Sequence, residues 1–170
     1  VLPVLEFSDI EDVFGFIKPI VDVHTMGVYT IANLLRDCGY KVVMAKDDIN
    51  EAIEKIQKLN NYCLLKKWIL DNHINRLCFS YRLDPQEGCD YFMTMYHLLQ
   101  NDNMFVEQKG PIKDISFAGL PDTCAMVKGK TEGKVVVFQG NETPSESLIR
   151  YGVPDEVLSD SLKDENEYDK

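Results

Sequence analysis

The sequence lacks several features that would assign a function directly. Its 170 residues contain no apolar run long enough to cross a bilayer. They contain no G-x-G-x-x-G stretch either, which excludes the usual dinucleotide-binding loop. The five cysteines include no C-x-x-C pair, so neither a zinc cluster nor a disulfide framework is indicated. Scattered thiols of this kind are typical of a reduced, cytoplasmic protein.

Positive charge is also scarce. The chain has 18 lysine and arginine residues against 28 aspartates and glutamates, and its formal net charge is −10 at pH 7. We therefore expect neither a nucleic acid nor an anionic membrane as a partner. The length and the apolar fraction of 45% are ordinary for one soluble globular domain.

What the sequence does contain is an alternation of strand-like and helix-like segments. Helical periodicity separates short apolar runs that predict five strands, at 17–23, 40–45, 74–81, 113–119 and 134–140. Strands that alternate with helices predict an α/β fold with a parallel sheet. Right-handed crossovers then favour a flavodoxin-like (Rossmann-like) five-stranded sheet in the order 2-1-3-4-5, with helices on both faces.

The domain boundaries follow from the same pattern. Residues 1–16 precede the first predicted strand and are expected to form a short lead-in. Residues 17–154 are expected to form the folded domain. Residues 155–170 are rich in acidic side chains, which predicts a solvated tail or a linker to a further domain.

Polar and small residues gather at one edge of this predicted sheet. Asp22, His24 and Gly27 follow the first predicted strand. Ser80 lies at the end of the third strand, and Gly119 lies at the end of the fourth. Ligands of such sheets bind outside the carboxyl ends of the strands, near the point where the strand order reverses. A carboxylate and an imidazole one residue apart thus flank the expected ligand site.

The string Asp22-Val-His24-Thr-Met-Gly27 resembles the D-x-H-x-x-G signature of cobalamin-binding domains. Such domains occur in mutases, corrinoid methyltransferases and some radical S-adenosylmethionine enzymes. The resemblance implies that His24 is the lower axial ligand of cobalt. It implies that Asp22 accepts a hydrogen bond from the other ring nitrogen and so orients the ligand. It also implies that Gly27 leaves room for the nucleotide tail of the cofactor.

Two further signatures of the family are matched less closely. The family carries S-x-L after the third strand, where this sequence has Ser80-Tyr-Arg-Leu83, one residue longer. It carries two glycines after the fourth strand, where this sequence has Ala followed by Gly119. The resemblance covers roughly residues 17–150 and implies Ser80, Leu83 and Gly119 as further contacts of the cofactor.

Other functions found on this fold lack their residues here. A phosphorelay receiver needs an acidic pair after the first strand, an aspartate ending the third and a lysine ending the fifth. This chain offers Asp22 alone, with Ser80 and Gln139 at the other two positions. The segment "DVHTMG" is a poor phosphate loop for a flavodoxin, and no second histidine stands near His24 to complete a zinc site.

The resemblance implies a cobalamin-binding domain of a cobalamin-dependent enzyme, without naming the form of cobalamin or the reaction. The cofactor carries the cobalt–carbon chemistry, so we expect no catalysis by the domain alone. A catalytic domain or partner subunit of the methyltransferase, mutase or radical S-adenosylmethionine type is expected to cover the upper face of the corrin. The competing interpretation is a cofactor-free interaction module in which Asp22 and His24 only cap the following helix.

Overall fold

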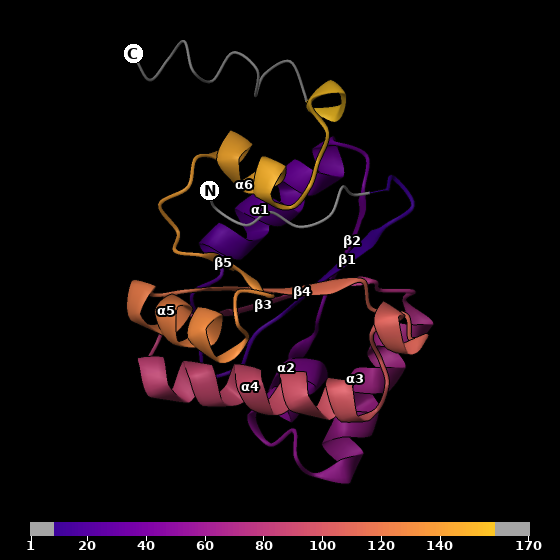
Figure 1. The fold of residues 1–170 in the computed structure, drawn as a ribbon, viewed down its shortest axis with the longest axis vertical. Coiled ribbons are helices and arrows are strands. Elements are labelled where there is room, and N and C mark those ends of the chain that lie inside the picture. Colours follow the sequence, from indigo (N-terminus) through magenta and orange to yellow (C-terminus); the bar gives the residue numbers. More distant parts are fainter. Residues whose placement is uncertain (1–8, 159–170) are drawn as a thin grey trace.

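A parallel sheet forms the middle layer of the computed structural model, which describes residues 9–158 (Figure 1). The strand order is β2-β1-β3-β4-β5, and every neighbouring pair is parallel. The fold class and the strand order predicted from the sequence are therefore confirmed. The strands are β1 (Val13–Ile17), β2 (Lys41–Met44), β3 (Arg76–Tyr81), β4 (Asp114–Gly119) and β5 (Val136–Phe138).

Helices cover both faces of the sheet. One face carries α1 (Met26–Asp37) and α6 (Pro144–Arg150) (Figure 1). The other carries α2 (Asp47–Glu54), α3 (Leu59–Asp71), α4 (Pro85–Asn101) and α5 (Pro121–Lys130). Two short 3₁₀ turns, η1 (Val106–Gln108) and η2 (Asp155–Val157), complete the elements. Among the helices of the described residues, none has the length and apolar character that crossing a bilayer requires.

Each face of the sheet has its own apolar core. Phe79 of β3 and Phe117 of β4 belong to the larger core, beneath α2 to α5. Residues adjacent to these in the strands point the other way, since side chains of a strand alternate between faces. Thus Cys78 and Ala118 belong to the smaller core, beneath α1 and α6. The candidate site lies beside this smaller core.

The first strand lies earlier in the chain than the sequence pattern predicts. β1 ends at Ile17, the first residue of the predicted 17–23 strand, and otherwise lies inside the expected lead-in. Pro19 has no N–H to donate to a neighbouring strand. Its carbonyl instead accepts a hydrogen bond from the N–H of Asp22 at 3.1 Å, in a turn. Residues 18–25 are therefore a loop, and this loop carries the acid–histidine pair.

The folded unit also extends further toward the C-terminus than predicted. The expected tail begins with η2, and Leu158 after it is buried against the smaller core. Apolar burial of this kind holds the start of the segment on the domain. The remainder of the predicted tail, 159–170, and residues 1–8 of the lead-in lie outside the described residues.

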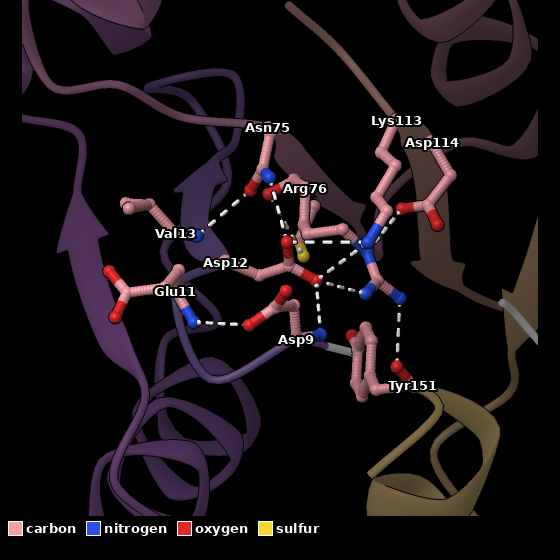
Figure 2. A network of polar contacts seen from close by, with 10 residues as sticks. Asp9, Glu11, Asp12, Val13, Asn75, Arg76, Lys113, Asp114 and Tyr151 are labelled. Carbon is pink, nitrogen blue, oxygen red and sulfur yellow. Dashed lines mark hydrogen bonds and ion pairs between the residues drawn. The ribbon is translucent and has the colours of Figure 1, made fainter. Parts of the chain in front are cut away.

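A buried ion-pair network occupies the edge of the sheet where β1, β3 and β4 begin (Figure 2). The Arg76 guanidinium donates to Asp114 Oδ1 at 2.7 Å, Asp12 Oδ2 at 3.0 Å and the carbonyl of Tyr151 at 2.8 Å. Asn75 Nδ2 donates to the other oxygen of Asp12 at 2.8 Å. Burial raises the pKa of Asp114 to about 6. A buried guanidinium must be paired in this way, so the network joins the strand starts to the segment after α6.

Candidate functional site

A cavity of about 420 Å³ opens at the carboxyl edge of the sheet, on the face covered by α1 and α6. Its walls are mainly apolar and include Phe16 of β1, Ile31 of α1 and Phe138 of β5. On the sheet side, the short side chains of Ser80 and Ala118 leave the space open. Pockets that bind small molecules have volumes of about 300–1,000 Å³ and mostly apolar walls. The cavity therefore has the size and character of a ligand site.

The loop between β1 and α1 is held by one buried carboxylate. Asp22 Oδ1 accepts a hydrogen bond from the backbone N–H of His24 at 2.9 Å, and Oδ2 accepts one from the N–H of Arg82 at 2.7 Å. The Lys18 ammonium donates to the backbone carbonyl of Asp22. Asp22 is fully buried, and a buried carboxylate needs such donors. It therefore fastens the loop to the end of β3.

The same carboxylate orients the His24 ring. His24 Nδ1 lies 2.7 Å from Asp22 Oδ1. An ionised carboxylate only accepts hydrogen bonds, so Nδ1 is the donor of this pair, and in a neutral imidazole Nε2 then presents its lone pair. The His24 side chain is 53% exposed and lies on the cavity wall. Histidines that bind a metal are usually held through their other ring nitrogen in this way.

Neither member of the pair caps the following helix. The N-cap of α1 is Thr25, and no side chain accepts a hydrogen bond from the helix there. Both oxygens of Asp22 are engaged by His24 and by the N–H of Arg82 instead. The helix-capping role that the competing interpretation gives to this pair is therefore wrong.

Four of the six predicted site residues meet at this edge of the sheet. Asp22 and His24 form the bonded pair, while Gly27 and Ser80 line the cavity beside them. Gly27 lies in the first turn of α1, and a Cβ built at this position would meet no atom within 4 Å. Protein packing alone thus does not require a glycine here. Its missing side chain widens the mouth of the cavity.

The structure does not bring Leu83 or Gly119 to the cavity wall. Leu83 packs against the larger core on the opposite face. A Cβ at Gly119 would lie 2.5 Å from the carbonyl oxygen of Tyr81 and 2.7 Å from the Phe117 ring. Close packing therefore requires a glycine at residue 119. The preceding residue, Ala118, lines the cavity instead.

Two charged residues on the cavity wall were not predicted from the sequence. The Glu142 carboxylate accepts hydrogen bonds from the N–H groups of Gln139 and Gly140, at 3.1 and 3.2 Å. Arg82 donates through Nη2 to the carbonyl of Gln139 at 3.4 Å. The link between β3 and the β5–α6 loop depends on the folded topology. The sequence did carry one signal, because Arg82 lies in the stretch that is one residue longer than S-x-L.

A metal held here would take one ligand from the protein. Across residues 9–158, no group of three or more His, Cys, Asp or Glu side chains is arranged to hold a metal ion. His24 offers one imidazole nitrogen, and the carboxylate beside it is already engaged. The other ligands of such a metal would have to come from a cofactor or from solvent.

The fold and the site together define an α/β protein with a ligand-sized cavity where the strand order reverses. The oriented histidine lies at the mouth of that cavity. No protein-family model matches the chain, and no curated protein matches it either. The function must therefore be argued from the site itself.

Proposed function

We propose that this chain is a cobalamin-binding domain in which His24 is the lower axial ligand of cobalt and the cavity receives the nucleotide tail. The observation that carries the proposal is the hydrogen bond between Asp22 and His24 at the mouth of the cavity. A corrin ring already gives cobalt four nitrogen ligands, so the protein needs to supply only one. The single oriented imidazole of His24 meets this requirement.

The cavity suits a nucleotide tail in size and polarity. The tail consists of an aromatic base, a sugar and a phosphodiester. A volume of about 420 Å³ with mainly apolar walls fits the base. Gly27 leaves the mouth open, and Ser80 adds a hydroxyl to the wall. These two residues would admit the tail and contact it.

The surface around His24 suits the lower face of a corrin. Large apolar side chains in the loop and in the first turns of α1 are at least half exposed, namely Val21, Val23, Met26 and Tyr29. A group of exposed apolar side chains often marks a binding surface. Contact with a macrocycle would remove this apolar area from water.

Bound cobalamin supplies the cobalt–carbon chemistry, while this chain binds the cofactor, orients it and excludes water from the tail. In this arrangement residues 9–158 would contact the lower face of the corrin, and a catalytic domain or partner subunit would cover the upper face. Methyltransferase, mutase and radical S-adenosylmethionine reactions all fit this division. The proposed setting is the reducing cytoplasm, because none of the five cysteines forms a disulfide and Cys63 is exposed.

A binding experiment tests the proposal. The purified chain is mixed with hydroxocobalamin and desalted, and its visible spectrum is recorded. We expect a corrin spectrum that elutes with the protein and is weaker in His24→Ala. The control is His97→Ala, because His97 lies on α4 and not on the cavity wall. A colourless protein peak would overturn the proposal.

A further inference from the structure

Arg82 is the one lysine or arginine among the described residues that line the cavity. Its backbone N–H is fixed by the hydrogen bond to Asp22 Oδ2. Its side chain extends toward the loop after β5, where its guanidinium nitrogens approach Gly140. Gly140 has a φ of +91°, and a Cβ there would lie 2.9 Å from Arg82 Nη1. The glycine therefore leaves the space in which the guanidinium lies.

The Arg82 guanidinium has donors to spare. It makes one long hydrogen bond, 3.4 Å to the carbonyl of Gln139, although a guanidinium carries five N–H groups. No ion pair joins Arg82 to a carboxylate within residues 9–158. Glu142 is nearby on the wall, but its oxygens accept from the backbone N–H groups of Gln139 and Gly140. A charged group with free donors thus lies on the wall of an apolar cavity.

We infer that Arg82 pairs with the phosphodiester of the nucleotide tail, an inference that rests on the proposed cobalamin function. The phosphodiester is the anionic group of the tail, and a guanidinium matches phosphate oxygens in both charge and geometry. An isolated positive charge is needed here because the chain as a whole carries a net charge of −10 and would otherwise repel an anion.

The two halves of Arg82 then serve different parts of the cofactor. Its backbone N–H holds Asp22 and so positions His24, while its side chain binds the phosphate. A side-chain substitution keeps the backbone N–H. Such a variant should lose affinity for the tail and still supply the axial ligand. This separation distinguishes a phosphate contact from a general structural role.

The test compares two corrinoids, hydroxocobalamin and cobinamide, which lacks the nucleotide and its phosphate. We expect Arg82→Gln to weaken cobalamin binding by about 10–100-fold, the range for a hydrogen bond to a charged group, and to leave cobinamide binding unchanged. The cobalamin affinity of Arg82→Lys should fall between those of the parent and Arg82→Gln, because lysine keeps the positive charge but lacks the paired N–H donors of a guanidinium. Cobalamin binding by the parent should also weaken with salt more than binding by Arg82→Gln.

The matched control is Arg36→Gln, the same change on the exposed side of α1 and outside the cavity wall. It should bind both corrinoids as the parent does, and thermal unfolding confirms that each variant is folded. Equal cobalamin affinity for Arg82→Gln and the parent would overturn the inference and leave the proposed function standing. Equal losses for both corrinoids would give Arg82 a structural role instead. A parent that binds no cobalamin would overturn the proposed function and this inference with it.

Discussion

Replacing Asp22 by asparagine should loosen the site without changing its shape. An asparagine keeps one acceptor oxygen where the carboxylate has two, and its amide nitrogen can only donate. If the oxygen faces His24, the amide faces the N–H of Arg82, which now bonds to Asp22 Oδ2 at 2.7 Å. If the amide is flipped, the bonds to the His24 N–H and Nδ1, at 2.9 and 2.7 Å, are lost instead.

Either orientation removes at least one hydrogen bond to an ionised acceptor at a fully buried position. The expected loss in the free energy of unfolding is about 1.5–3 kcal/mol. Removing a carboxylate behind a metal-binding histidine also weakens ligand affinity, typically by about 10–100-fold. We therefore expect Asp22→Asn to be both less stable and a weaker binder of cobalamin than the parent.

Chemical denaturation measures the first effect and a cobalamin titration measures the second. The control is Asp37→Asn, the same change at the exposed end of α1, which should alter stability by no more than about 0.5 kcal/mol. Unchanged stability of Asp22→Asn would refute the view that this carboxylate fastens the loop to β3. Unchanged affinity would refute its role in orienting His24.

Three further predictions concern the rest of the domain. Arg76→Met should lower the free energy of unfolding by about 3–5 kcal/mol, because the carboxylates of Asp12 and Asp114 lose the buried guanidinium between them, and chemical denaturation measures it. Burial raises the pKa of Asp114 from 3.8 to about 6, so its protonated form stabilises the fold below about pH 4 and this contribution is lost as the pH rises through 6. A stability difference between the parent and Asp114→Asn that stays constant from about pH 4 to 7 would contradict this. Gly27→Leu should keep the domain folded but block cobalamin, whereas Gly119→Val should destabilise the fold, since of these two glycines Gly119 is the one without room for a Cβ. Circular dichroism and a cobalamin titration separate the two outcomes.

The strand order could be predicted from the sequence because apolar runs alternate with helical periodicity throughout. The position of β1 could not be predicted, because residues 17–23 have the apolar content of a strand. Pro19, which interrupts that segment, is the reason it forms a loop instead. The true strand carries Gly15, where a Cβ would lie 2.6 Å from the Ile74 side chain. This close packing across the fold is invisible in a local pattern.

The candidate site, too, could be predicted from the sequence only in part. The Asp22–His24 contact joins residues two apart and is the one that the resemblance implies. The contact between Asp22 and Arg82 joins residues 60 apart, and only the folded sheet brings them together. The expectation for Gly119 is displaced by one residue, which in a strand moves a side chain to the opposite face. Ala118 faces the cavity for that reason.

The most direct test of the central claim identifies the nitrogen bound to cobalt. Protein uniformly enriched in nitrogen-15 is loaded with unlabelled cobalamin, reduced to cob(II)alamin and measured by electron paramagnetic resonance. If His24 is the axial ligand, the superhyperfine splitting changes from a triplet to a doublet, and the doublet is absent in His24→Ala. A triplet that survives enrichment would show that the ligand nitrogen belongs to the cofactor, and would contradict the assignment of His24.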